Sequence, residues 1–266
     1  MQARRRLVIC LHALAAMNRI PFWLKVAYTA FVAIIIRPYV RQYGWRNFLW
    51  FSDIALFATA PALWLESPLL ISMQAVSVTV PETGWTADLV ARQVFRMRLI
   101  GLADYMFDRR IPRSVRALSL FHLWLPPLLL WSMGRLGYDR RAFRAQTVLT
   151  SIMLVTTYAV TEPADDINWV FGLSGSPQRS VNPQAYLLFV MLIYPIAFYW
   201  PAHAAFSRLF PNPSDLHHDV RPRVLRRSAP EESEKSDRDS GGGLSAAPAK
   251  DSAPGAAMAS AASGCR

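Results

Sequence analysis

The stretch Asn-Phe-Leu-Trp-Phe-Ser-Asp-Ile-Ala-Leu-Phe, residues 47–57, decides how the fold is interpreted. It places an adjacent hydroxyl and carboxylate, Ser52 and Asp53, in a segment that is otherwise apolar enough for lipid. A charge at the centre of a bilayer costs about 2.5–3.5 kcal/mol on insertion scales. Asp53 therefore requires a partner or a function, and the rest of the chain can be searched for either.

Apolar runs recur on both sides of this stretch, and a membrane-spanning helix needs about 20 mostly apolar residues. We predict such helices at 22–39, 47–65, 68–80, 118–133, 146–160 and 186–205. Pro81, Glu82 and Asp88 interrupt the third segment, so its extension to residue 91 stays open. Trp and Tyr residues cluster near the segment ends, as they do in interface belts. The sequence thus predicts an all-α, polytopic transmembrane bundle of about six helices over residues 17–209.

The two ends of the chain differ in character from this domain. Residues 1–16 have the arginines and apolar run of a secretory signal, with Ala13-Leu14-Ala15 as a cleavage site. Met17 as the true start and an interfacial helix are the alternatives. Residues 210–266 are first charged and proline-punctuated, and then almost entirely Gly, Ser, Ala and Pro. We predict a disordered tail there, because little apolar surface is available to offset the entropy of ordering.

The net charge of +11 belongs mainly to the loops of the membrane domain. Of the 29 basic residues, all but three are arginine, whose planar fork pairs with phosphate in a bidentate way. We therefore expect anionic membrane lipids as partners and no nucleic acid. The expected location is the bacterial inner (cytoplasmic) membrane, multi-pass, with the tail in the cytoplasm, although the distribution of arginines barely decides the orientation. No feature of the sequence indicates an oligomeric state.

The most informative pair of residues is Ser52 with His122. In an alternating topology their helices enter the membrane from the same side, and both residues lie about 6–9 Å below that boundary. A hydroxyl and an imidazole at one depth make a nucleophile and its general base. Asp53 would orient the imidazole or a neighbouring arginine such as Arg46, or be neutralised by that arginine.

Two prolines follow His122 and bear on its surroundings. Pro126 and Pro127 lack the N–H groups that would bond the carbonyls of His122 and Leu123, so we expect the helix to open or kink there. Irregular backbone at membrane depth is tolerated where it packs in protein or lines a wet cavity. This predicts a polar pocket at His122. The alternative is that His122 is a packing residue and that the prolines only bend the bundle.

The loops on the same side supply further polar groups. Residues 101–108 form an amphipathic piece among arginines, and residues 166–172 form an aromatic turn. A lid made of these loops would grip a phosphate head group through arginines, and Asp104 and Asn168 would orient the substrate. The alternative is an ordinary interfacial loop with Arg–Asp pairs. The predicted substrate-binding residues are Asp104, Arg109, Arg110, Arg113 and Asn168.

Other chemistry is not indicated by the sequence. His217-His218 lacks acidic or thiol partners at metal-binding spacing, and Cys10 and Cys265 suggest neither a disulfide framework nor a zinc site. No metal and no cofactor is expected. His203 falls at the opposite side from Ser52 and His122, which makes it an interface residue.

The chain resembles a family of bacterial polytopic membrane-associated proteins across residues 17 to about 210. The segments that carry the resemblance are Ile20–Lys25, Tyr43-Gly44, Asn47–Leu56, Asp104–Asp108, Ser119–Pro126, Leu136–Ala142 and Asn168–Gly172. This family has no established activity to transfer. Relatives often have Cys where this chain has Ser52, and either side chain serves as a nucleophile or in packing.

A second likeness, in topology and two positions, is to androgen-induced lipid hydrolases and related six-helix acyltransferases. Those enzymes pair a hydroxyl or thiol nucleophile on an early helix with a histidine on a later one. The likeness implies an intramembrane lipid hydrolase or acyltransferase with Ser52 as nucleophile, His122 as base and Asp53 as orienting group. The alternative is a non-enzymatic membrane component, either a small-solute or proton-coupled carrier or a scaffold.

Overall fold

The computed structural model describes residues 20–165, 167–172 and 177–211, and these residues form helices and no strands. The all-α prediction is therefore confirmed for the described part of the chain. The predictions for residues 1–16 and for the tail beyond Pro211 lie outside the described residues.

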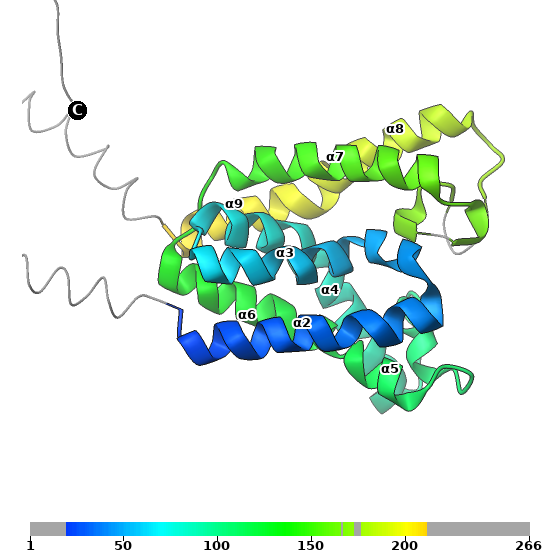
Figure 1. Ribbon diagram of the computed structural model, residues 1–266. Coiled ribbons are helices and arrows are strands. Elements are labelled where there is room, and N and C mark those ends of the chain that lie inside the picture. Colours follow the sequence, from blue (N-terminus) through cyan, green and yellow to red (C-terminus); the bar gives the residue numbers. More distant parts are fainter. Residues whose placement is uncertain (1–19, 166, 173–176, 212–266) are drawn as a thin grey trace, which may run out of the picture. The chain divides into compact units, whose positions relative to one another are not determined.

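Six helical segments make up the described bundle (Figure 1). Their bounds are α2 Phe22–Tyr43; α3 Phe51–Leu65; α4 Pro68–Phe95; α5 Arg113–Leu118 leading into α6 Phe121–Leu136; α7 Ala142–Val160; and α8 Pro183–Ile193, which continues through a π-helical turn, Tyr194–Tyr199, into α9 Trp200–Leu209. Short 3₁₀ turns at Trp45–Leu49 (η1), Asp104–Phe107 (η2), Pro163–Asp165 (η3) and Ile167–Trp169 (η4) lie in the connections.

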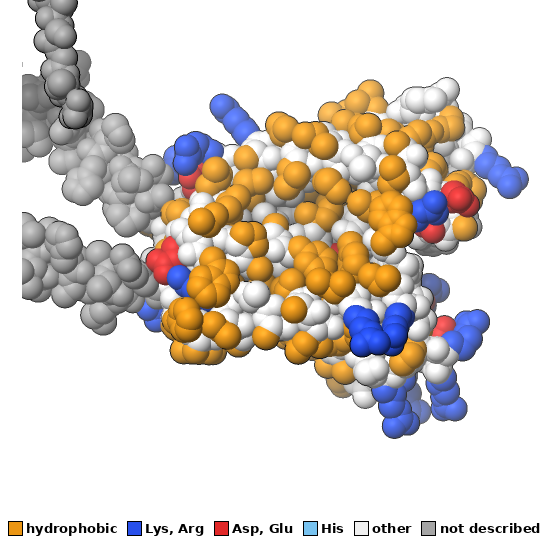
Figure 2. Space-filling model, viewed as in Figure 1, with side chains coloured by type: hydrophobic (Ala, Val, Ile, Leu, Met, Phe, Trp, Pro, Cys, Tyr) orange, Lys and Arg blue, Asp and Glu red, His pale blue; other side chains and the backbone are white. Residues whose placement is uncertain are grey.

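Three of these segments are long and apolar enough to cross a membrane: Phe22–Tyr43, Arg113–Leu136 and Pro183–Leu209. The helix α3 is apolar but shorter. In the view of Figure 2, hydrophobic side chains cover the flanks of the helices, and Lys and Arg side chains lie mainly toward the two ends. A helix bundle with this distribution fits lipid along its sides and water at its ends.

The segments alternate in direction, so α2 begins and α9 ends at the same end of the bundle (Figure 1). At this first end Lys25 pairs with Glu66 across 2.6 Å, and Ser72 accepts a hydrogen bond from the Asp139 backbone N–H. At the opposite end Arg46 pairs with Asp165 across 3.0 Å.

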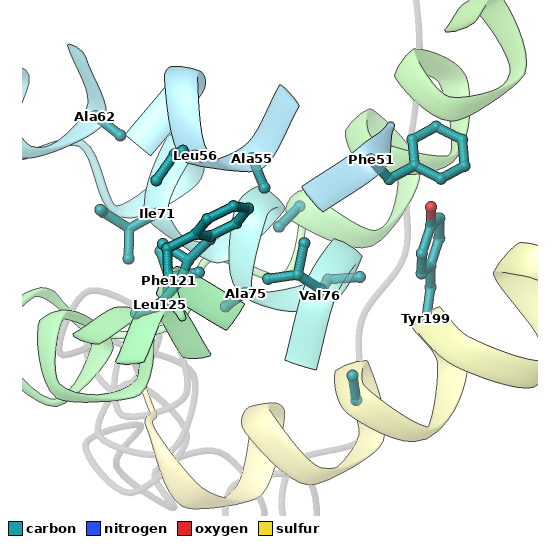
Figure 3. Packing of buried hydrophobic residues seen from close by; sticks show 14 of the residues in the cluster. Phe51, Ala55, Leu56, Ala62, Ile71, Ala75, Val76, Phe121, Leu125 and Tyr199 are labelled. Carbon is teal, nitrogen blue, oxygen red and sulfur yellow. The ribbon is translucent and has the colours of Figure 1, made fainter. Parts of the chain in front are cut away.

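The central helix is α4, which packs against α3, α6 and α7. Figure 3 shows its Ile71, Ala75 and Val76 beside Leu56 of α3 and Phe121 of α6. Small side chains at such contacts let helix backbones approach closely, and close packing rather than the hydrophobic effect joins helices in lipid.

The extension of this central helix beyond residue 80, which the sequence leaves open, is present. α4 continues as one helix from Pro68 through Pro81 to Phe95. The two carboxylates that argued for a break both have partners, because Glu82 contacts His122 and Asp88 accepts backbone N–H groups from the following loop. A paired charge does not have to end a buried helix.

The predicted opening at the two prolines of the later helix is not seen. α6 contains Pro126 and Pro127 and is helical from Phe121 to Leu136. Pro126 is buried in the bundle, so packing holds the helix despite the missing N–H groups.

Candidate functional site

A histidine and a carboxylate meet inside the opposite end of the bundle. The His122 Nδ1 atom of α6 lies 2.6 Å from Glu82 Oε2 of α4. The side chain of Glu82 is 5% exposed and that of His122 is 12% exposed. A pair this buried is stable only with good geometry and further hydrogen bonds, and removing one partner strands the other.

The same depth for both residues follows from helix geometry. Glu82 is fourteen residues after the start of α4, and His122 is fourteen residues before the end of α6. At 1.5 Å per residue, each residue lies about 21 Å from the first end of the bundle. The antiparallel packing of α4 on α6 therefore brings the two side chains together.

Aromatic rings enclose the imidazole. Phe121 stacks on His122 with ring centroids 4.1 Å apart, and Trp85 lies 4.6 Å away on another side. Tyr105, in the loop after α4, lies 6.3 Å from Trp85. These rings limit water around the pair and strengthen its electrostatic interaction.

Hydroxyl groups continue the site next to these rings. The Tyr39 hydroxyl of α2 and Ser119 Oγ lie 2.6 Å apart, and Tyr105 is a further hydrogen-bond partner of Ser119. Burial holds the pKa of Tyr105 well above its usual value, so its hydroxyl keeps its proton and can donate.

Asp53 adds a second carboxylate to this region from α3. It is 3% exposed, it accepts a hydrogen bond of 2.9 Å from Asn47 Nδ2, and it lies close enough to Glu82 for the two carboxylates to interact electrostatically. Arg46, the partner that we expected for it, pairs instead with Asp165. The chain turns between Arg46 and Asn47 so that the amide, and not the guanidinium, faces inward.

We call the resulting group of side chains the polar cluster. Its members come from α2, α3, α4, α6 and the two loops that join α4 to α6, and they are Tyr39, Tyr43, Asp53, Glu82, Trp85, Tyr105, Ser119 and His122.

The expected hydrogen bond between Ser52 and His122 is not formed in the described residues, where the imidazole contacts Glu82 instead. Ser52 is half-buried at the start of α3, at the same end of the bundle as His122. Equal depth was thus not sufficient to place the two side chains in contact. The catalytic roles of Ser52, His122 and Asp53 stay predictions.

Asn168 forms two hydrogen bonds to the backbone, and its contact with substrate stays a prediction. Its Oδ1 accepts from the Phe51 backbone N–H at 3.2 Å, and its Nδ2 donates to the Leu49 carbonyl at 2.8 Å. The side chain is 1% exposed and joins the turn after α7 to the start of α3. Both ends of the amide are used, so Asn168 fixes the position of Asp53 by way of the backbone.

Carboxylates hold the arginine-rich loop between α4 and α5, residues 96–112. Asp88 accepts four backbone N–H bonds, of 2.9 to 3.1 Å, from Leu99, Ile100, Gly101 and Ala103. Burial raises the pKa of Asp88, but these four donors lower it more, so the pKa lies below its usual value. The carboxylate therefore stays charged and fixes the loop.

The five predicted substrate-binding residues are not brought together as one site. Asp104 pairs with Arg92 and with Arg98, the latter across 2.8 Å. Arg110 pairs with Asp108, while Arg109 and Arg113 are exposed. These contacts match the alternative of an interfacial loop with Arg–Asp pairs.

His203 lies at the first end of the bundle, as predicted. Its Nδ1 is 2.7 Å from the Tyr138 hydroxyl. Within the described ranges, no group of three or more His, Cys, Asp or Glu side chains is placed to hold a metal ion.

Four members of the polar cluster were not predicted as site residues from the sequence: Glu82, Trp85, Tyr39 and Ser119. A signal for Glu82 was present, because it is a carboxylate inside an apolar run at the same helical depth as His122. The pairing itself joins residues 40 positions apart, and only the packing of α4 on α6 reveals it.

Comparisons with protein-family models, with curated proteins and with solved structures find no match to this chain.

Proposed function

We propose that the chain is an integral membrane protein of the bacterial inner membrane and an intramembrane lipid hydrolase or acyltransferase. The observation that carries the proposal is the contact between Glu82 Oε2 and His122 Nδ1. A carboxylate at Nδ1 holds that proton and leaves Nε2 as the basic nitrogen, which is the role of the acidic residue in hydrolytic triads.

The reaction follows from this arrangement. His122 Nε2 takes the proton of an attacking hydroxyl, which belongs to water in a hydrolase and to an acceptor alcohol in an acyltransferase. The hydroxyl oxygen bonds to the ester carbonyl carbon of a lipid. The bond to the leaving alcohol then breaks, and His122 returns the proton to that alcohol. Glu82 stabilises the imidazolium between the two transfers.

Access to the imidazole supports the same proposal. His122 keeps some exposure while Glu82 is almost fully enclosed, which is the order required if substrate approaches the imidazole and the carboxylate stands behind it. The surrounding apolar helices suit a substrate that arrives from lipid.

The test is lipid turnover by the purified full chain in vesicles of mixed bacterial-type phospholipids, with fatty-acid release or acyl exchange followed by mass spectrometry. We expect His122→Gln and Glu82→Gln to lower the rate by about 10²–10⁴-fold. His203→Gln, at the first end of the bundle, is the matched control and should keep the wild-type rate. Absence of turnover in the wild type, or an unchanged rate in His122→Gln, would contradict the proposal.

A second candidate function is proton-coupled transport of a small solute. It is favoured by the contact of Glu82 with His122 and by the buried Asp53 on a third helix, since ionisable residues at membrane depth form proton relays. A pH-sensitive dye inside the same vesicles distinguishes the two functions. Dissipation of an imposed pH gradient that Glu82→Gln abolishes, in vesicles whose lipids stay intact, would favour the carrier.

A further inference from the structure

The polar cluster contains buried polar atoms that lack a partner. Among the described residues, Asp53 Oδ1, Trp85 Nε1 and the Tyr43 hydroxyl are buried and form no hydrogen bond. Asp53 is 3% and Trp85 is 5% exposed. Buried polar groups are rarely left unpaired, because the loss of water is then not compensated. Three such atoms in one place indicate a missing partner.

The three atoms belong to one continuous set of contacts around the Glu82–His122 pair. On one side, Trp85 contacts both His122 and Tyr105. On the other side, the Tyr39 and Tyr43 rings are 5.6 Å apart, and Asp53 acts electrostatically on both tyrosines.

The contacts close through the hydroxyl groups and the second carboxylate. Ser119 joins Tyr39 to Tyr105, and Asp53 interacts with Glu82. Three of the buried unpaired atoms of the described residues therefore belong to the polar cluster, whereas others, such as those of Gln74, Gln146 and Thr157, lie elsewhere in the bundle.

The kinds of unpaired atom select the chemistry of the partner. Asp53 Oδ1 needs a donor, Trp85 Nε1 needs an acceptor, and the Tyr43 hydroxyl can take either role. An ammonium group only donates, so it leaves Trp85 unpaired. A phosphate only accepts, so it leaves Asp53 Oδ1 unpaired. A hydroxyl group both donates and accepts, and it is neutral.

A charged donor, Arg116, lies on α5, beyond the loop that contains Tyr105. Arg116 on α5 donates through Nη1 to the Met106 carbonyl at 2.8 Å, while its buried Nε has no partner among the described residues. Guanidinium groups pair well with phosphate. A head group with hydroxyls at one end and a phosphate at the other satisfies both Arg116 and the polar cluster.

We propose that the polar cluster binds the glycerol hydroxyls of a phosphoglycerol lipid head group. This inference rests on the proposed function, because it names the substrate class of the same site. The glycerol lies against Asp53, Trp85 and Tyr43, and the phosphate lies toward Arg116. This orientation brings a head-group hydroxyl toward His122, where it would be the acceptor alcohol of the acyltransferase reaction.

The test measures binding without turnover. The full chain in detergent micelles is titrated with two diether lipids of equal chain length and charge, diether phosphatidylglycerol and diether phosphatidylpropanol, and bound lipid is counted by native mass spectrometry. Neither lipid has an ester to cleave, and they differ only in the glycerol hydroxyls. We expect the wild type to prefer phosphatidylglycerol by about tenfold or more, since each hydrogen bond to a charged group contributes roughly that factor.

Two conservative variants locate the preference. Trp85→Phe and Tyr43→Phe each remove one polar atom and should bring the preference to within about threefold, given the net value of a neutral hydrogen bond. Tyr158→Phe, in α7 where the ring stacks on Phe171, is the control and should keep it. Gel filtration and melting temperature verify that each variant is folded.

Equal binding of the two lipids by the wild type would overturn the inference. A preference for phosphatidylglycerol that is unchanged in both Trp85→Phe and Tyr43→Phe would also overturn the inference. Water alone would then be the partner of the unpaired atoms. A preference without turnover of ester lipids supports the binding site and contradicts the enzymatic proposal. Turnover of ester lipids without a preference for phosphatidylglycerol supports the enzymatic proposal and contradicts the binding site.

Discussion

At the scale of a single residue, the contacts of Asp53 predict how its substitution changes the stability of the fold. Among the described residues its side chain accepts one hydrogen bond, from Asn47, so Asp53→Ala should lower the free energy of unfolding by about 1–3 kcal/mol by stranding that amide. Asp53→Asn keeps an acceptor oxygen for the Asn47 amide and should unfold close to the wild type. Thermal denaturation in detergent measures both changes.

Arg46 provides the control for Asp53. Arg46→Gln loses the partly exposed contacts with Asp165 and Glu162, each of which contributes about 0–1 kcal/mol, and should change stability little. If Arg46→Gln were as damaging as Asp53→Ala, the sequence-based hypothesis of an Arg46–Asp53 pair would be favoured over the observed contacts.

Ser52 separates two chemical routes. Because the imidazole contacts Glu82 and forms no hydrogen bond with Ser52 among the described residues, we expect direct attack by water or alcohol. Ser52→Ala should therefore keep most of the lipid turnover, and a fluorophosphonate probe should label the wild type and the variant to the same extent. Loss of both turnover and labelling in Ser52→Ala would instead establish a covalent serine mechanism.

At this scale the sequence predicted that His122 and Asp53 are special, but not their partners. Both are polar residues in apolar runs, and insertion cost alone marks them. Which side chain meets His122 depends on how α4 rotates against α6, and no local pattern in the sequence encodes that rotation. The structural bonds of Asn168 were missed for the same reason, since its amide binds backbone groups more than a hundred positions away.

The loop after α4 is the element whose order depends on one carboxylate. Asp88→Asn leaves a single acceptor oxygen and adds two donors that face the N–H groups of Leu99 to Ala103. We expect hydrogen exchange at residues 99–103 to quicken at least tenfold in the variant, because two or more hydrogen bonds are lost. Exchange in α6 should stay unchanged. Equal protection of the loop in both proteins would show that other contacts order it.

The hydrogen bonds between Asp88 and the loop after α4 should weaken in acid. The pKa of Asp88 is lowered in the folded protein, so its stabilising effect is present above the unfolded value of about 3.9 and is lost as the pH falls through the folded value. Loop protection, corrected for intrinsic exchange rates, should therefore fall on acidification below about pH 4. A loop that is equally protected at pH 3 and pH 6 would contradict this role for Asp88.

At the scale of elements the sequence predicted most helices well and left the end of α4 open. Hydrophobic length places a helix without knowledge of its neighbours, and this was sufficient for α2, α6 and α7. The end of α4 could not be placed in the same way, because Pro81, Glu82 and Asp88 suggest a break when their partners are unknown. The tertiary contacts of Glu82 and Asp88 outweigh that local signal.

The whole molecule makes a prediction about sidedness. Arg140, after α6, and Arg109, before α5, are exposed at opposite ends of the bundle. With Cys10 and Cys265 replaced by serine, Arg140→Cys and Arg109→Cys should react with a membrane-impermeant maleimide from opposite sides of sealed vesicles. Reaction of both cysteines from one side would contradict a bundle that spans the membrane.

The central claim is that Glu82 and His122 act as one catalytic unit, and a double-mutant cycle of lipid turnover tests it most directly. Residues that work as a unit are strongly non-additive in their effects on rate. We predict that Glu82→Gln with His122→Gln together lower the turnover no further than His122→Gln alone, with the folded state of each variant verified by melting temperature. Effects that multiply across the two positions would contradict the account.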